Sequence, residues 1–350
     1  MMTELECVIR DKFHKRYAVF TGNGTTAMYL AFQALGMQEK KVLYPAISCT
    51  NPVNAAIYAR YNVDFCDINL DDYTMDIEKL KQMLQTEQYG ILVATHIYGH
   101  RYNEKIIRDL CNRYHVILFE DAAQSFYISE DADLSVMSFG HTKVCETLLG
   151  GGVILTDDAK LAEAIADKRL LLPDKAILPN TLFDEYRKRY YTITKAALPW
   201  ELRNQKLRDL QMESKKYFIY DLHENPMILK ELKEMKETVE MRRQKAMLYE
   251  DQLNKAYVVQ PKKKDPFCWR YTFLYKGNQE YLLEQARKKN IDISSWYLSL
   301  AGIYKNEHKS NADKLEKSVI NLWVDSSHTE TQIQKEIADI NRIMEEDHAR

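Results

Sequence analysis

An acid, a lysine and a glycine turn lie within one stretch of the chain, between Glu120 and Val153. Asp121 follows an apolar segment, Lys143 follows a second apolar segment after a short loop, and Gly150-Gly151-Gly152 begins seven positions after Lys143. An amine beside apolar residues has a lowered pKa and becomes nucleophilic, and an aspartate can keep a pyridine nitrogen protonated. The stretch therefore predicts a site for pyridoxal 5'-phosphate (PLP), in which Lys143 forms a Schiff base and Asp121 binds the ring nitrogen.

Residues that could bind the cofactor phosphate occur in two other places. Gly24, Thr25 and Thr26 stand at the start of a predicted helix, where backbone N–H groups and the helix dipole attract anions. Ser138, five positions before Lys143, could donate to the same phosphate. Each feature also has an ordinary explanation: a loop with a helix N-cap for the first, and a buried serine at a strand end for the second.

Four further side chains are candidates for the same site. Gln124 could reach the cofactor ring oxygen or face solvent in a turn. His96, after a buried strand, and His141, in the lysine loop, could act in catalysis, with a purely structural role equally open. Cys49 is by default a small buried hydrophobe. Asp121 itself could be no more than a helix N-cap.

The composition is that of an ordinary globular protein. The 350 residues are enough for one large and one smaller domain, and 45% hydrophobic with 29% charged residues is typical of soluble chains. A net charge of −2 gives no sign of nucleic-acid or membrane-surface binding, and neither a membrane span nor a signal pattern is apparent. Six scattered cysteines without a CxxC pair predict reduced thiols, a cytoplasmic location and no metal site.

Strands and helices alternate over the first half of the chain. Predicted strands are 41–44, 63–67, 90–95, 116–119, 134–139 and 152–155, and predicted helices are 25–35, 51–60, 77–84, 103–114 and 158–171. This alternation predicts an α/β fold with a mostly parallel central sheet and helices on both faces. Ligands bind such sheets beyond the carboxyl ends of the strands, which is where Asp121 lies.

The second half is different. Residues 181–256 are rich in charges and aromatic side chains and predict helices. A strand at 269–275, a helix at 279–289, a short strand at 291–293 and a closing helix at 329–344 follow. We expect a large PLP-binding domain over 1–204 and a smaller C-terminal α+β domain, with a helical connection, over 205–350. Lys262-Lys263-Lys264 predicts a solvated loop.

Taken in order, these segments resemble the DegT/DnrJ/EryC1/StrS family of sugar aminotransferases. The matching segments are 23–28, 45–55, 96–99, 120–124, 138–143 and 151–152, so the resemblance covers about residues 5 to 175 well and the tail loosely. It implies the fold-type I aminotransferase architecture and a homodimer with active sites at the subunit interface. It also implies transfer of an amino group from glutamate or glutamine to a keto sugar, usually nucleotide-linked, in aminosugar or surface-polysaccharide biosynthesis.

The resemblance also assigns residues to roles. Lys143 would form the Schiff base and carry a proton between Cα of the donor and C4′ of the cofactor. Asp121 would hold the pyridinium and Gln124 the ring hydroxyl, and the phosphate would lie against Thr25, Thr26 and Ser138. A branch of the family replaces this lysine with histidine and performs dehydration, so the lysine argues against that branch.

Several positions depart from the family pattern. Cys49 stands where members often have an aromatic residue that stacks on the cofactor. The asparagine segment that reaches the neighbouring subunit's phosphate is not recognisable, and Asn225 is a doubtful substitute. Gly150 replaces a glutamate before the paired glycines, and the chain begins later than members often do. In the tail, Tyr297 could contact substrate where the small domain closes.

Three hypotheses follow from these residues. The first is an aminotransferase acting on a keto sugar, and the intact set of Asp121, Gln124 and Lys143 favours it. The second is a PLP enzyme of the same fold with another ketone substrate, such as a cyclitol, or with different chemistry, which a screen of keto substrates would separate. The third is a catalytically idle PLP-binding homologue or regulator, which turnover with any amino donor would exclude.

Overall fold

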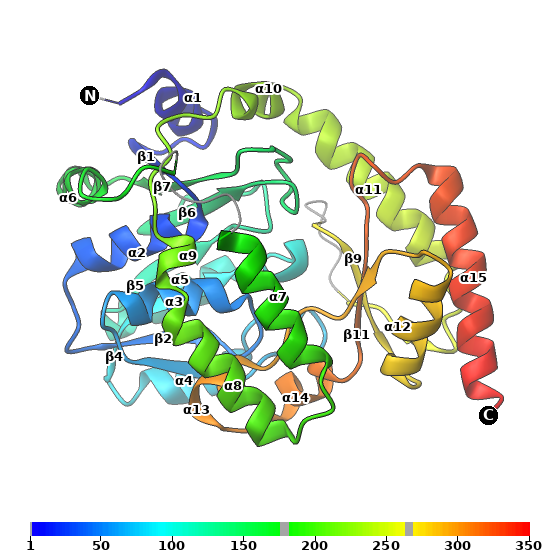
Figure 1. Ribbon diagram of the computed structural model, residues 1–350. Coiled ribbons are helices and arrows are strands. Elements are labelled where there is room, and N and C mark those ends of the chain that lie inside the picture. The colour runs from blue at the N-terminus through cyan, green and yellow to red at the C-terminus, as the bar shows by residue number, and fades with distance from the viewer. Residues whose placement is uncertain (1, 176–181, 263–268) are drawn as a thin grey trace.

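A seven-stranded sheet forms the centre of the larger part of the protein (Figure 1). The structure is a computed structural model that describes residues 2–175, 182–262 and 269–350. The strand order is β1-β7-β6-β5-β4-β2-β3. The strands are β1 (Tyr17–Thr21), β2 (Lys41–Pro45), β3 (Val63–Cys66), β4 (Tyr89–Thr95), β5 (Ile117–Asp121), β6 (Leu134–Phe139) and β7 (Gly151–Thr156). Strands β6, β5, β4, β2 and β3 run parallel, and β7 is antiparallel to both of its neighbours. The predicted mostly parallel sheet is confirmed.

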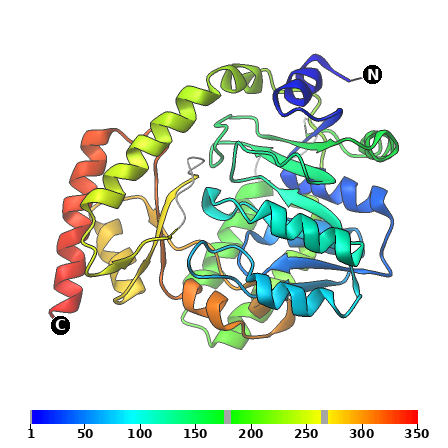
Figure 2. The same cartoon turned by 180° about the vertical axis from the view of Figure 1, so that it is seen from behind.

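Helices cover both faces of this sheet, as the alternation of its side chains shows. Val42 and Val93 pack into one apolar cluster, whereas Leu43 and Leu92, one position away on the same strands, pack into another. Successive side chains of a strand point to opposite faces, so each cluster belongs to one face. The first cluster includes residues of α2 (Gly24–Leu35) and α3 (Thr50–Tyr58), and the second includes residues of α4 (Ile77–Leu84) and α5 (Glu104–Tyr114), which lie in front of the sheet in Figure 2.

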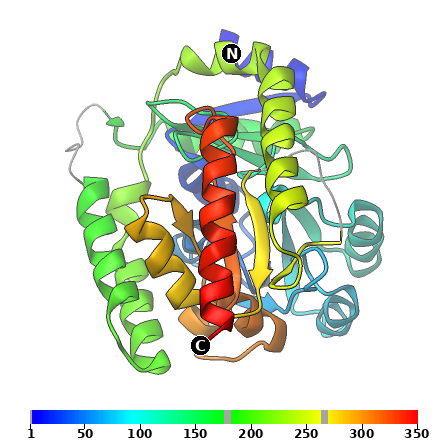
Figure 3. The same ribbon diagram turned by 90° about the vertical axis from the view of Figure 1, so that its right-hand side faces the viewer.

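A second, antiparallel sheet forms the smaller part, with the order β10-β11-β9-β8. Its strands are β8 (Val258–Val259), β9 (Tyr271–Tyr275), β10 (Ile293–Ser294) and β11 (Val319–Leu322). Three helices pack against it around a separate apolar core: α11 (Met235–Gln252), α12 (Gln279–Lys288) and α15 (Glu330–His348). Figure 3 shows α15 lying between the other two on the outside of the molecule. The predicted smaller α+β region is therefore confirmed.

The charged and aromatic middle of the chain forms helices that follow the last strand of the large sheet in the sequence and precede the first strand of the small one. They are α7 (Leu182–Lys195), α8 (Trp200–Glu213), α9 (Lys215–Phe218) and α10 (Met227–Lys233). Leu207 of α8 packs into the core of the large sheet, and so do Leu300 of α13 (Leu300–Lys305) and Leu315 of α14 (Ser310–Glu316). Residues on both sides of position 204 thus share one core, and the division into 1–204 and 205–350 stays a proposal.

Several elements have no counterpart in the sequence prediction. They are α1 (Glu4–Lys12), β1, the single turn η1 (Ile97–Gly99), β8, α13, α14 and β11, whereas α6 (Ala159–Arg169) agrees with its prediction. In the predicted basic loop, Lys262 is exposed and pairs with Asp71 at 2.8 Å, while Lys263 and Lys264 lie outside the described residues, as does Cys268. Within the described ranges, none of the helices combines the length and apolar character needed to cross a bilayer.

Replacing Leu30 with alanine tests the core that α2 forms with the sheet. Leu30 is fully buried, so we expect Leu30→Ala to lower the free energy of unfolding by about 2–5 kcal/mol through lost burial and the cavity that remains. The matched control is Leu170→Ala, because the Leu170 side chain is 77% exposed and should change stability by less than about 0.5 kcal/mol. Urea denaturation of both variants measures the difference, and equal stabilities would contradict this packing.

Candidate active site

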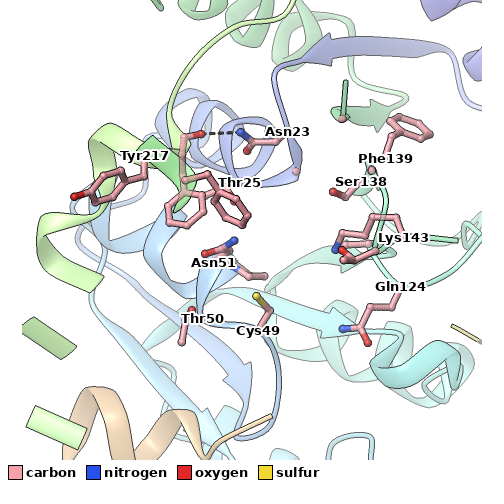
Figure 4. A pocket seen from close by; sticks show the side chains of 18 of the residues that line it. Asn23, Thr25, Cys49, Thr50, Asn51, Gln124, Ser138, Phe139, Lys143 and Tyr217 are labelled. Carbon is pink, nitrogen blue, oxygen red and sulfur yellow. Dashed lines mark hydrogen bonds between the residues drawn. The ribbon is translucent and has the colours of Figure 1, made fainter. Parts of the chain in front are cut away.

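One cavity of about 580 Å³ lies at the carboxyl ends of the parallel strands, a volume typical of small-molecule sites. Asp121 is the last residue of β5, Cys49 is the N-cap of α3, and Lys143 lies in the loop between β6 and β7. Figure 4 shows Ser138, Lys143 and Gln124 on one side of the cavity and Cys49 and Asn51 on the other. The structure thus brings together most of the residues that the sequence singled out.

The lysine loop, which we define as residues 140–150, holds Lys143 in a fixed turn. The N–H of Lys143 donates to the Gly140 carbonyl at 2.9 Å, and the N–H of Gly140 donates to the Cys145 carbonyl at 3.1 Å. Gly140 has a φ of 152°, a conformation that favours glycine. The loop therefore presents the Lys143 side chain to the cavity from a backbone that its own hydrogen bonds constrain.

Burial changes the acid–base properties of both central groups. It lowers the pKa of Lys143, an effect that Cys49 and Asp121 partly offset. It raises the pKa of Asp121, an effect that the Ala123 N–H and Lys143 partly offset. The pKa values of a carboxyl group and an amine in this setting change strongly when a charge is placed between them, because little water screens either group.

The start of α2 has the features of a phosphate site. The Asn23 side chain accepts from the Thr26 N–H at 2.8 Å, and the N–H groups of Gly24 and Thr25 have no partner within the helix, as is general for the first turn. A Cβ on Gly24 would lie 3.0 Å from Cβ of Ser138, so this glycine leaves room beside the Ser138 hydroxyl. Amide donors, the positive end of a helix and two hydroxyls suit a phosphate, so the residues present fit the predicted group.

Thr26 does not share in that arrangement. Its side chain is fully buried and does not line the cavity, and its hydroxyl donates to the Phe218 carbonyl at 2.8 Å. The Asn23 amide donates to the same carbonyl at 2.9 Å (Figure 4). The Thr26 hydroxyl, predicted to bind the phosphate, thus instead fixes the C-terminal end of α9 against the start of α2.

Gln124 lies in the cavity wall with its amide oxygen occupied. Oε1 accepts from the Tyr98 N–H at 2.9 Å, and the side chain is 2% exposed. The amide NH₂ group is therefore the part of Gln124 that remains for a ligand. A donor at this position agrees with the predicted contact to the cofactor ring hydroxyl.

His96 lies one layer behind the cavity. Its Nε2 is 2.8 Å from Oε1 of Glu120, and both side chains are completely buried. The imidazole ring stacks on Tyr102 at a centroid distance of 4.8 Å. The backbone N–H of His96 donates to the backbone carbonyl of Asp121 at 3.0 Å. His96 is not among the residues that line the cavity. These contacts support a role in positioning Asp121, and they give no support to the predicted catalytic role.

A model of the DegT/DnrJ/EryC1/StrS aminotransferase family matches residues 1–341 of this chain. The chain belongs to this family. Among its curated relatives is the UDP-4-amino-4,6-dideoxy-N-acetyl-beta-L-altrosamine transaminase of Campylobacter jejuni, 30% identical over 192 residues, which are 52% of this chain and 50% of the relative. GDP-perosamine synthase of Escherichia coli O157:H7 is 30% identical over 155 residues, 42% of each chain. The chain thus spans about half the length of the curated relatives it matches.

Solved structures share the fold at lower sequence identity. NtdA of Bacillus subtilis, solved with its cofactor PMP, superimposes with a TM-score of 0.75 at 19% identity over 98% of this chain and 76% of that one. DesV of S. venezuelae, solved with a ketimine intermediate, gives 0.76 at 17% identity over 99% and 90%. These likenesses confirm the predicted fold-type I aminotransferase architecture.

One position of this family member differs from the sequence-based expectation. Asn225 is fully buried, and its amide donates to the Gly150 carbonyl at 2.7 Å and to the Thr147 hydroxyl at 3.2 Å. It therefore supports the lysine loop of its own chain and does not extend toward a neighbouring subunit. Tyr297 lines the cavity as expected, with its N–H donating to the Tyr98 hydroxyl at 3.0 Å, and His141 lies exposed at the cavity wall.

The aromatic side chains of α7 and α9 line the cavity and were not predicted. Tyr186 and Tyr190 pack around Phe218, and the Tyr186 hydroxyl interacts with the Gln211 amide. Lys175 and Arg187 lie in the same wall. The signal in the sequence was the recurrence of aromatic residues every three to four positions in 183–190, which places them on one face of a helix.

Of the described residues, no group of His, Cys, Asp and Glu side chains could hold a metal ion.

The lowered pKa of Lys143 can be measured in the cofactor-free protein. Only the unprotonated amine reacts with trinitrobenzenesulfonate, so we expect labelling of Lys143 to reach its maximal rate at a lower pH than labelling of the exposed Lys188. Mass spectrometry of peptides after short exposures from neutral to alkaline pH gives both rates within one sample. Coincident pH profiles for the two lysines would contradict the burial described for Lys143.

Proposed function

We propose that this chain is a PLP-dependent aminotransferase that moves an amino group from glutamate or glutamine to a keto sugar. The observation that carries the proposal is a single cavity that holds a lysine of lowered pKa, a buried aspartate and a phosphate-binding helix end. Membership of an aminotransferase family supports the reaction type. The PMP bound to NtdA supports the cofactor.

Each residue has a defined task in this proposal. Gly24, Thr25, Asp121, Gln124 and Ser138 all line the cavity. Gly24, Thr25 and Ser138 would hold the phosphate, Asp121 would bind the ring nitrogen and Gln124 would donate to the ring hydroxyl. When bound, PLP supplies the electron sink that stabilises negative charge at the substrate carbon. A cationic ring nitrogen favours the carboxylate form of Asp121, which offsets the effect of burial on its pKa.

Lys143 moves the proton. Its lowered pKa leaves a larger fraction of the amine unprotonated near neutral pH, and a base whose pKa lies near the working pH transfers protons most efficiently. The unprotonated Nζ would accept the proton from Cα of the amino donor and would return it to C4′, the cofactor carbon on the other side of the amino nitrogen. Aromatic side chains on α7 and α9 limit the access of water to this step.

The acceptor is proposed to be a nucleotide-linked keto sugar. The UDP- and GDP-linked sugars in the names of two relatives support this class. In this chain, the rings of Tyr186 and Tyr190 and the cations of Lys175 and Arg187 offer stacking and charge to a nucleoside diphosphate. A relative from Bacillus subtilis, 29% identical over 166 residues, is named as a 3-oxo-glucose-6-phosphate:glutamate aminotransferase. A keto sugar phosphate is therefore the acceptor to test beside the nucleotide-linked keto sugar.

The homodimer with shared active sites and the cytoplasmic location are also proposals. Leu148 and Leu149 of the lysine loop are 84% and 45% exposed beside the cavity, which supports a partner surface there. The five described cysteines form no disulfide, which supports a reducing compartment. Light scattering measures the mass in solution, and mixed dimers of two differently inactivated chains test whether the sites are shared.

The visible absorption spectrum tests the proposed reaction. Protein with added PLP should show a yellow band that bleaches with L-glutamate, as the cofactor takes the amino group. Lys143→Ala should lack the lysine-linked band and turnover but remain folded, because it removes a nucleophile. Lys188→Ala, at an exposed site, is the matched control. A fully active Lys143→Ala variant, or wild-type protein without any band, would refute the assignment.

Replacing Asp121 with asparagine tests the contact to the ring nitrogen. The change keeps the shape and removes the charge, so we expect PLP to bind while the glutamate half-reaction slows by about 10²–10³-fold, as for loss of one electrostatic contact in a buried site. Stopped-flow absorbance measures that rate. Asp131→Asn, at an exposed position one loop away, is the control. An Asp121→Asn rate equal to that of the control would remove Asp121 from the mechanism.

A further inference from the structure

Three residues of the smaller domain make polar contacts with consecutive parts of the lysine loop. Arg242 of α11 donates through Nη2 to the Lys143 carbonyl at 3.3 Å and to Oε1 of Glu146. Trp269, just before β9, donates through Nε1 to the Thr142 carbonyl at 2.7 Å. The Ser326 hydroxyl donates to Oε2 of Glu146 at 2.7 Å. Residues far apart in the chain therefore converge on positions 142–146.

The Arg242 guanidinium is the centre of this contact. Its side chain is only 2% exposed, and a charge removed from water is tolerated only with a counter-charge and good hydrogen bonds. Glu146 supplies the counter-charge, and Nη1 donates to the Trp269 carbonyl at 2.9 Å. One planar group thus fixes Glu146, the Lys143 carbonyl and Trp269 relative to one another, which its rigid array of donors suits better than a lysine would.

Trp269 also belongs to the cavity. Its ring lines the cavity wall and lies parallel to the rings of Tyr98, at 6.3 Å, and Tyr297, at 6.2 Å. The residue that holds the Thr142 carbonyl therefore contacts the space in which a substrate would lie. The same residue thus contacts both the lysine loop and the cavity wall.

We infer that Arg242 and Glu146, with Trp269, form a clamp that positions the Lys143 amine by fixing its backbone from the smaller domain. The clamp acts on the proposed aminotransferase reaction and rests on that function. Arg242 does not line the cavity, so it is a positioning residue. Proton transfer depends on the placement of Nζ, and a displacement of about 1 Å can cost as much as about 10²-fold in rate.

The test uses three variants and a neighbouring control. Arg242→Met removes the charge, Glu146→Gln removes its partner while keeping the shape, and Trp269→Phe keeps a ring but removes the N–H. Arg243→Met is the control, because Arg243 is adjacent on α11, is 45% exposed and pairs only with Glu240 of its own helix among the acidic side chains described. If Arg242→Met does not fold, Arg242→Lys keeps the charge and loses the planar array.

We expect the three clamp variants to lower kcat for the glutamate reaction by about 10- to 100-fold, with a smaller change in KM. They should also move the pH at which the visible band of the holoenzyme titrates, because that pH reports the surroundings of the Lys143 nitrogen. Arg243→Met should leave both properties unchanged. Clamp variants with wild-type kcat and a wild-type titration would overturn the inference.

Hydrogen exchange in the cofactor-free protein gives a readout independent of activity. Backbone amides of residues 140–150 should exchange faster in Arg242→Met and Glu146→Gln than in the wild type or in Arg243→Met. Unchanged exchange in those variants would overturn the clamp. If the wild-type protein forms no band and shows no transamination, the proposed function fails, while the exchange measurement still decides whether the clamp holds the loop.

Discussion

The free-energy cost of placing an amine and a carboxylate in a poorly hydrated cavity is the constraint on which the rest of this structure depends. Burial destabilises the charged forms of Lys143 and Asp121, and each partly compensates the other. The unprotonated amine that results is the form that reacts with carbonyl carbons. The cost has to be offset elsewhere, by the core of the sheet and by hydrogen bonds that keep the lysine loop closed on itself.

The topology explains how three distant segments reach one place. Asp121 ends β5, Ser138 lies near the end of β6, and Gly24 begins the helix that follows β1. A Cβ on Gly152 would lie 2.2 Å from the Asn23 carbonyl carbon, so the absence of a side chain lets β7 approach the start of α2. Gly152, which lies in β7 just after the lysine loop, thus serves close packing and brings the phosphate-binding helix end toward Lys143.

The sequence predicted the larger sheet well because its strands are near-continuous apolar runs between helices with a clear period. β6 has its predicted bounds, and α2 differs by one residue from prediction. β1 and β11 were missed: Tyr17–Thr21 and Val319–Leu322 are short, and flanking polar segments conceal them. Such strands form because partners far along the chain pair with them, which no local pattern contains.

In the site, the sequence predicted residues with distinctive chemistry and misjudged those whose function depends on contacts. Lys143, Asp121 and Ser138 line the cavity as expected. Thr26 and His96 have the right residue types beside the right segments, yet their polar atoms bond to Phe218 and Glu120. A residue type and its position in the sequence do not determine whether its side chain points into the cavity or away from it. Contacts with residues far along the chain determine that direction.

The contact between the smaller domain and the lysine loop likewise depends on residues far apart in the sequence. Arg242 and Glu146 are 96 positions apart, in a helix and a loop. From the local sequence alone, each of these charged side chains would be predicted to face solvent. As a pair in which Arg242 is buried and Glu146 is partly exposed, they join the smaller domain to the backbone of Lys143. Because a buried ion pair contributes little net stability compared with apolar packing, stability alone is a weak reason for this one. An orientation that a planar guanidinium imposes on the loop carrying Lys143 is the better physical reason, since apolar side chains could fill that space but could not hold a carbonyl in place.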